Sequence, residues 1–239
     1  MRGIYCYFVV LLTLLGNKTE GLAQHYSHTA IWLRLAPSWT ISKSVLISGD
    51  FHYRRQSDPD HLLNPVYAPL TKAGRLGLTY RYGSWSLQLN PLMYFQSYPA
   101  LGTTADFSRP VNKEFRMSAL LEWNLPVSRQ MDVRLRGGYE YRLFANGTTA
   151  GRMRFRLMTR HQLSELYYFY VWNETLLAGP PNWNRFHPFE INRTALNLGY
   201  TISEHVSCEG GYQFSHRRRK SLIEFDEEHA LLLTVFLRI

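Results

Sequence analysis

Arginine residues recur at every second position of one short segment. Arg152, Arg154 and Arg156 are spaced so that all three side chains would lie on one face of an extended strand. Guanidinium groups aligned in this way focus positive potential and could select anions or hold lipid phosphates. Carboxylates such as Glu140 and Glu174 could instead hold them in a structural network, because small barrels are filled by side chains. We favour the structural network, although one geometry could serve both purposes.

Charged and apolar residues also alternate in the two segments 114–124 and 131–143, which are joined by a short turn. Such alternation is typical of β-strands with one polar and one apolar face. One antiparallel register would pair a carboxylate with a guanidinium three times: Glu122 with Arg134, Arg116 with Glu140, and Glu114 with Arg142. The sequence therefore predicts a hairpin with locked ion pairs on its polar face.

The arginines of 151–161 are left without partners by this register. If the barrel has a binding function, we expect it between Arg136, Arg154 and Arg156, where anions or lipid phosphates could be held. The charged residues predicted to line a common interior are Glu114, Arg116, Glu122, Arg134, Arg136, Glu140, Arg142, Arg152, Arg154, Arg156, Glu174 and Arg193.

Two serine–histidine pairs could belong to an enzyme. They occur in His25-Tyr26-Ser27-His28 and at Ser215-His216. An acyl hydrolase needs a nucleophile, a base and an orienting acid, for which Glu209 or Glu174 is available. No Gly-x-Ser-x-Gly motif is present, and we expect the first pair in a flexible N-terminal segment and His216 in a loop. We assign no catalytic residue and keep a lipid-modifying enzyme as an alternative.

The nine histidines lie along the chain without the spacing of a metal site, and there is no cysteine cluster. The sequence therefore predicts neither a metal ion nor a cofactor.

The elements that would position these residues are strands. Lengths of about ten residues suit strands that cross a membrane at a tilt. Alternation and turn residues predict eleven segments, 29–37, 45–54, 74–82, 85–95, 114–124, 131–143, 151–161, 165–176, 191–201, 205–216 and 228–238. The predicted fold is all-β, a single antiparallel up-and-down transmembrane barrel of 10–12 strands.

The predicted connections alternate between short turns and long polar loops. The long loops, at 55–73, 97–113, 177–190 and 217–227, would lie on the extracellular side of an outer-membrane barrel and the short turns on the periplasmic side. If the last strand ends on the periplasmic side and successive strands alternate in direction, the first strand, 29–37, begins on the extracellular side, where the long loops lie. Because bacterial barrels have even strand numbers, we expect either a twelfth strand or a path for residues 24–28 back through the barrel.

The N-terminal residues predict export. Arg2 precedes the apolar run 4–15, and Gly21-Leu22-Ala23 resembles a cleavage site, so residues 1–23 form a signal peptide and residues 24–239 the barrel domain. The apolar run is too short for a membrane helix, which takes about 20 residues. The product is expected in the bacterial outer membrane.

The surface and partners follow from charge and aromatic content. The formal net charge of +9 indicates contact with lipopolysaccharide or phospholipid headgroups, whereas nucleic acid is excluded by compartment. The basic run at 217–220 is predicted to be a solvated loop. The apolar last strand is predicted to be recognised by the barrel-assembly machinery. Tryptophans near predicted strand ends indicate aromatic girdles: Trp32, Trp39, Trp85, Trp123 and Trp172.

Three alternatives to a closed structural barrel stay open. A soluble lipocalin-like carrier would be apolar inside and polar outside, a lipid-modifying enzyme would need a catalytic site, and a narrow anion channel would need a water path. The interior is expected to be too tightly filled for large solutes.

Several short motifs carry a family resemblance. The pattern of Glu114-x-Arg116, the ladder from Arg152 to Arg156, Asn173-Glu174, Phe189-Glu190-Ile191-Asn192-Arg193 and Leu196-x-Leu198-Gly199-Tyr200 resembles the bacterial family catalogued as domain of unknown function 2490 (DUF2490), which comprises predicted outer-membrane barrels. The resemblance covers most of 28–238. It implies fold and location, and it transfers no catalytic residues.

Overall fold

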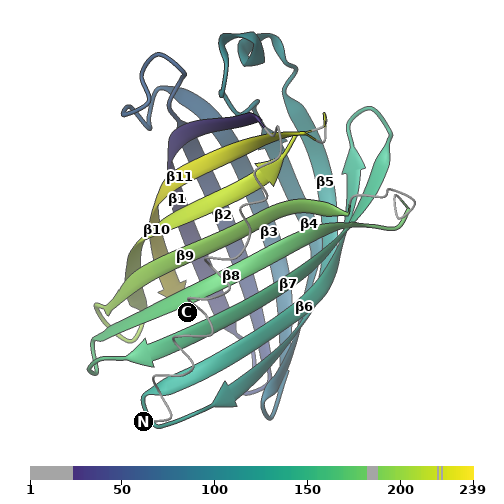
Figure 1. The fold of residues 1–239 in the computed structure, drawn as a ribbon. Helices are drawn as coiled ribbons and strands as arrows, with labels where there is room; N and C mark the ends of the chain where they lie inside the picture. The colour runs from purple at the N-terminus through teal and green to yellow at the C-terminus, as the bar shows by residue number, and fades with distance from the viewer. Residues whose placement is uncertain (1–23, 182–187, 220, 222) are drawn as a thin grey trace.

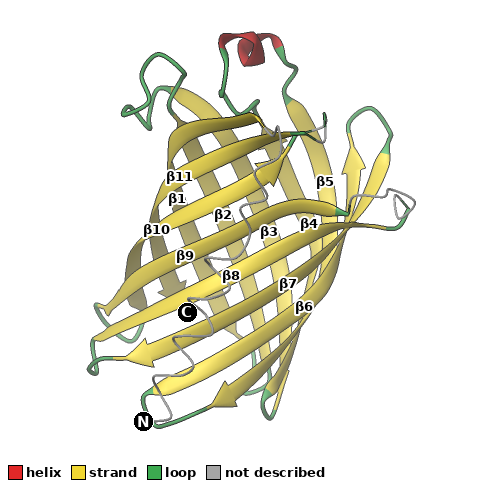
Figure 2. Cartoon of the chain, viewed as in Figure 1, coloured by secondary structure: helices red, strands yellow, loops and turns green. Residues whose placement is uncertain are grey.

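Eleven strands close into a barrel in the computed structural model, which describes residues 24–181, 188–219, 221 and 223–239 (Figures 1 and 2). The signal-peptide prediction for 1–23 lies outside the described residues. A short 3-10 helix, η1 (Thr104–Ser108), sits above one rim, and no helix in the described ranges is long and apolar enough to span a membrane. The strands are β1 (Gln24–Thr40), β2 (Val45–Gln56), β3 (Ala68–Tyr82), β4 (Trp85–Ser97), β5 (Asn112–Pro126), β6 (Met131–Phe144), β7 (Thr149–Gln162), β8 (Tyr167–Gly179), β9 (Phe189–Thr201), β10 (Val206–Arg218) and β11 (Glu224–Arg238).

All eleven predicted segments are strands, but the predicted topology is wrong at the closure. Successive strands pair antiparallel, whereas β1 pairs with β11 in parallel, from Gln24 opposite Glu224 to Ser38 opposite Arg238. An odd number of strands joined by hairpins begins and ends in the same direction, so the closing pair must be parallel. No twelfth strand occurs in the described part of the chain, and residues 24–28 belong to β1 instead of passing back through the barrel.

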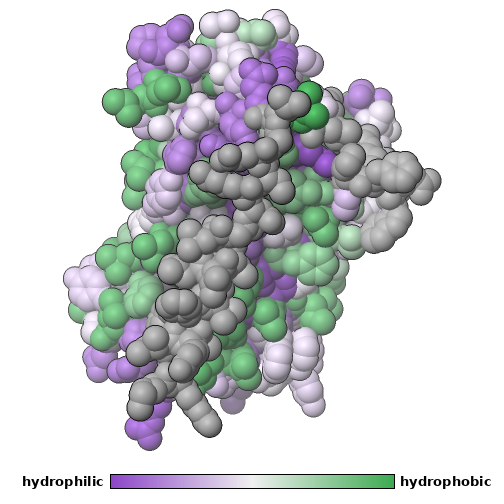
Figure 3. Space-filling view, in the orientation of Figure 1, coloured by the Kyte–Doolittle hydropathy of each residue, from purple (hydrophilic) through white to green (hydrophobic). Residues whose placement is uncertain are grey.

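The faces of the strands have the predicted polarity. On β2 the Phe51 side chain points outward and is 54% exposed, while its neighbour Asp50 points inward and is 2% exposed. Figure 3 shows apolar residues on the visible outer wall and hydrophilic residues gathered at the upper end. A soluble carrier would have the reverse arrangement, so the lipocalin-like alternative is wrong.

The connections at the two rims differ in length, as predicted. The long loops 57–67 and 98–111 lie at one rim, together with the tight hairpin 145–148, the end of β8 and the end of β10, and the short turns lie at the other. Gly83 (φ 57°) and Gly147 (φ 79°) occupy tight turns at opposite rims, where the left-handed backbone favours glycine.

The aromatic girdle is predicted correctly only in part. Trp85 and Trp123 stack with ring centroids 5.7 Å apart near the short-turn rim, and Trp39 is exposed there too. Trp32 and Trp172 are instead buried side chains of the interior. Strand alternation decides this difference, because both lie on inward-facing positions.

The β4–β5 loop is fastened to strands far along the sheet. Gln56 at the end of β2 donates from Nε2 to the Pro99 carbonyl (2.7 Å), and Arg219 contacts Asp106 of η1 at 3.0 Å. Arg219 also binds Asp226 at 2.6 Å and is buried. The prediction of a solvated basic loop is therefore wrong for Arg219, and Lys220 lies outside the described residues.

The docking of the β4–β5 loop is expected to weaken in acid. Burial would raise the pKa of Asp106, but the backbone N–H of Thr103 and the Arg219 guanidinium outweigh burial and lower it. The ionised carboxylate therefore stabilises the docked loop above the usual aspartate pKa of about 4, and the contribution is lost as pH falls through the lower folded-state value.

We expect pepsin to cleave the loop at Phe107 more slowly in the native protein than in Asp106→Asn at about pH 4, and this difference should shrink as the pH is lowered further. The two proteins are compared at the same pH, so the pH dependence of pepsin's own activity affects both cleavage rates equally. Equal rates already at the higher pH would contradict the role of Asp106.

Candidate functional site

The predicted register of the hairpin formed by β5 and β6 is wrong by two residues. Strand β5 extends to Pro126, which pairs with Asp132 across a turn at 127–130, so the partners shift. Long side chains still reach diagonally, and two of the three predicted ion pairs form. The observed pairs are Arg116 with Glu140 (3.3 Å), Glu114 with Arg142 (2.7 Å), Glu122 with Arg136 (2.6 Å) and Arg134 with Asp132 (2.7 Å).

Three carboxylates, each 1% exposed, organise most of the predicted interior. They are Glu114, Glu140 and Glu174, on the inward faces of β5, β6 and β8. Each contacts several guanidiniums, which is how buried carboxylates are kept ionised. Glu114 binds Arg116 and Arg142, Glu140 binds Arg116, Arg152 and Arg154, and Glu174 binds Arg154 and Arg156.

The arginine ladder of β7 is paired with carboxylates, which agrees with the structural network that the sequence favoured; only the hairpin register, taken alone, had left these arginines without partners. Arg154 bridges Glu140 (3.4 Å) and Glu174 (2.8 Å), and Arg156 lies 3.1 Å from Glu174. Arg152 also binds Glu190 of β9 at 2.6 Å. Glu140 of β6 and Glu174 of β8 are the two carboxylates that the sequence had offered as partners, whereas Glu190 of β9 was not predicted.

A second cluster on β1, β2 and β3 escaped the sequence prediction. Asp50 accepts two hydrogen bonds from Arg34 (2.9 and 2.8 Å), contacts His52 at 2.8 Å, and is bonded by Arg75. Asp50 and Arg75 are direct cross-strand partners. Pairing the polar faces of the second and third predicted segments would have found this site.

One group of arginines is less completely neutralised. The Arg54 guanidinium stacks 3.4 Å over the Trp32 ring, and Arg193 lies 5.6 Å from the same ring. The nearest Glu174 contact of Arg193 is 3.9 Å long, and the buried Nε atoms of Arg54 and Arg193 have no hydrogen-bond partner among the described residues. Arg217 adds a third positive charge that acts on both, and the buried carboxylate of Glu228 opposes it. This group is called the Trp32 cluster below.

The interior encloses a cavity, so side chains do not fill it throughout. A cavity of about 2750 Å³ is lined from Asn146 and Ser221 near the long-loop rim to Arg160 and Arg238 near the short-turn rim. Ligand pockets typically measure about 300–1,000 Å³, so this cavity is larger than a usual small-molecule site. In the described part of the chain its lining carries seventeen arginines and one lysine against six carboxylates.

The serine–histidine pairs are not assembled for nucleophilic catalysis. His25 and Ser27 lie in β1 and His216 in β10, not in flexible segments as expected. Ser215 donates to Glu228 (3.4 Å), and Glu209 accepts from Tyr168 and Tyr170. Among the described residues no hydrogen bond joins a serine to a histidine side chain.

Comparison with solved structures finds barrels at low similarity. OmpT, an outer membrane protein of Vibrio cholerae, matches over 77% of this chain and 55% of its own, with 9% identity and a TM-score of 0.40. The NanC porin matches over 80% and 89% (8% identity, TM-score 0.42), and an anion-selective porin from Comamonas acidovorans over 72% and 48% (9%, 0.35). The chain thus spans about half the length of OmpT and of the Comamonas porin.

Sequence comparison identifies a family. No curated protein matches the chain. The family described as "Protein of unknown function (DUF2490)" matches residues 29–224, which is most of the sequence. The chain belongs to this family, as its arginine and carboxylate motifs had indicated.

Proposed function

We propose that the protein is an outer-membrane β-barrel whose positively charged lumen binds small anions and lets them pass. The observation that carries the proposal is the excess of arginine along a cavity that reaches from one rim to the other. The apolar outer wall supports a membrane location. In this proposal residues 1–23 are the export signal, residues 24–239 form the inserted barrel, and the long loops face lipopolysaccharide.

The ion-pair network and the anion path support each other physically. Buried carboxylates hold the arginines of β5 to β8 at fixed positions on the wall, which prevents them from collapsing into the cavity. The Trp32 cluster has fewer carboxylate contacts, so its positive potential remains available to a solute. A lumen lined in this way attracts anions and repels cations. The proposal includes no chemical step.

The proposal is tested by the selectivity of the barrel in planar bilayers. Under a gradient of potassium chloride we expect a reversal potential that reports preference for chloride. Replacing Arg54 and Arg193 together by Gln removes two charges that would act on an ion about 10 Å away in water with about 0.8 kcal/mol in total. The chloride preference should therefore fall about two- to fourfold.

Arg55→Gln is the matched control. Arg55 is the next residue along β2 after Arg54, and its side chain is bonded outside the cavity to the carbonyls of Val66 and Tyr67. Arg55→Gln is compared with Arg54→Gln alone, because each variant removes one positive charge. Substitution of Arg55 should leave selectivity unchanged. A barrel that conducts no ions, or that prefers potassium, would overturn the proposed function.

A further inference from the structure

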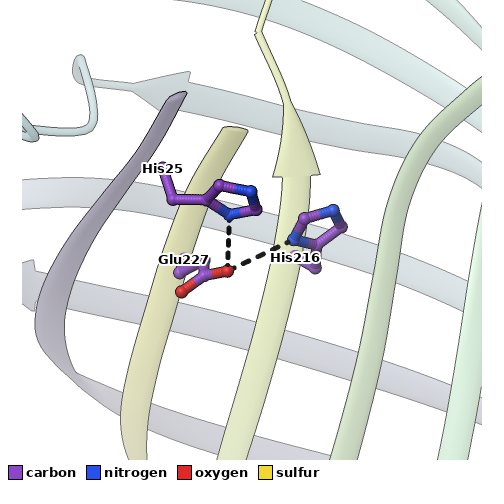
Figure 4. A group of neighbouring side chains, drawn as sticks. All are labelled: His25, His216 and Glu227. Carbon is purple, nitrogen blue, oxygen red and sulfur yellow. Dashed lines mark hydrogen bonds and ion pairs between the residues drawn. The ribbon is translucent and has the colours of Figure 1, made fainter. Parts of the chain in front are cut away.

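Three side chains from different strands converge on the outer face of the barrel. His25 lies in β1, Glu227 in β11 and His216 in β10, near the long-loop rim (Figure 4). His25 Nδ1 is 2.8 Å from Glu227 Oε1, and His216 Nδ1 is 3.7 Å from the same oxygen. One donor atom from each residue lies within 4.8 Å of the other two. The arrangement is separate from the charged lumen, because all three side chains occupy outward positions.

The donor distances are close to those of a metal site. Zinc binds imidazole nitrogen and carboxylate oxygen at about 2.0–2.2 Å, so donors at tetrahedral angles are about 3.3 Å apart. The two distances from Glu227 Oε1, 2.8 Å to His25 and 3.7 Å to His216, lie on either side of this value. Small side-chain rotations, without backbone movement, would bring the three donors around one ion. Two imidazoles and one carboxylate suit zinc and related transition metals rather than magnesium or calcium, which prefer oxygen.

Aromatic packing holds both imidazoles in place. The His216 ring stacks on Phe225 with centroids 4.5 Å apart, and the His25 ring stacks on the same phenyl group at 5.6 Å. Phe189 of β9 adds a contact with His216 at 6.0 Å. Ligands that are oriented before binding lose less entropy when the ion arrives. His25 remains 46% exposed, which leaves an open path for an ion and for a water ligand in the fourth position.

We propose that His25, His216 and Glu227 bind one zinc-type divalent cation that clamps the start of β1 to β11 and β10. The clamp lies at the parallel seam, where pairing is less stable per residue than in antiparallel strands. Because residues 25 and 227 are far apart in the chain, a shared ion would favour the closed barrel over the open chain. Protons compete for the imidazoles, so binding weakens in acid.

Isothermal titration of the detergent-folded barrel with zinc chloride tests the site. We expect one zinc per chain, with affinity reduced about tenfold or more in His216→Ala and in Glu227→Gln, a change of about 1.4 kcal/mol or more. Magnesium chloride should give no such binding. His61→Ala is the matched control, because His61 is an exposed histidine beside a carboxylate, Asp58, but lies in the β2–β3 loop.

A second measurement guards against misfolded variants. Zinc should raise the temperature at which the native barrel loses its compact gel mobility, and it should have no effect on His25→Ala/His216→Ala, whose fold is checked by the same gel without zinc. Equal zinc affinity in the native protein and this double variant would overturn the proposal, as would zinc binding that His61→Ala abolishes.

Discussion

Replacing Glu140 by Gln is expected to lower the free energy of unfolding of the barrel by about 3 kcal/mol or more. The side chain is 1% exposed and contacts Arg116, Arg152 and Arg154 at 3.3–3.4 Å. Gln keeps the shape but removes the charge, so the guanidiniums would repel one another across a poorly solvated gap. Because these arginines border the cavity, water can partly solvate the guanidiniums that lose their carboxylate. The loss of unfolding free energy is therefore expected at the lower end of the range for broken buried ion pairs.

Urea unfolding of the protein in lipid vesicles, followed by tryptophan fluorescence and gel mobility, measures this loss. Glu122→Gln is the matched control, since Glu122 has Arg136 as its partner and a more exposed carboxylate; its loss should cost about 1 kcal/mol or less. Similar losses for the two variants would contradict the central position of Glu140 in the network.

Placing an arginine on the outer wall is expected to cost about 2–4 kcal/mol, whereas the same change one residue away on the inner wall should cost much less. Leu233 on β11 is 50% exposed on the outer face, and Thr234 lines the cavity. Leu233→Arg would bury a cation in hydrocarbon. Thr234→Arg would place a cation in the cavity of about 2750 Å³, which is already lined by many arginines.

Unfolding free energies and the yield of inserted barrel after dilution into vesicles compare the two variants. The pair controls for charge, size and strand position, because the residues are adjacent. A larger cost for Thr234→Arg than for Leu233→Arg would mean that the outer wall is not in contact with lipid.

The period of two is what made the strands predictable. Because side chains alternate strictly across a strand, Phe51 and Asp50 could be assigned to opposite faces from their spacing alone, and the structure confirms both. The same rule put all twelve predicted charged residues on polar faces. For Trp32 and Trp172 the sequence did not decide between the two faces, because an aromatic side chain can face either the lipid or the lumen; the structure shows both facing inward.

Relations between strands were not predictable in the same way. The β5–β6 register depends on whether Pro126 ends the strand or begins the turn, and the sequence is compatible with both. Partners such as Glu190 for Arg152 come from strands that are distant in the chain. The His25, His216 and Glu227 cluster has no sequence spacing that would reveal it, because three strands contribute one residue each. The hollow interior depends on barrel diameter, which local patterns do not encode.

The parallel pairing of β1 with β11 also limits the order in which the barrel can assemble. One edge of β1 can be covered by β2, its neighbour in the chain, but its other edge needs residues 224–238, which lie some 200 positions further along the chain. Until then the backbone groups of that edge are open to pairing with other chains, which is the usual route to aggregation. Closure must also bring β11 alongside β1 in the same direction, so it cannot proceed by zipping from a hairpin turn. Pairing of β1 with β11 is therefore the slow, long-range step of assembly. Until it occurs, the open edge of β1 is where the unclosed barrel most needs to be kept from pairing with other chains.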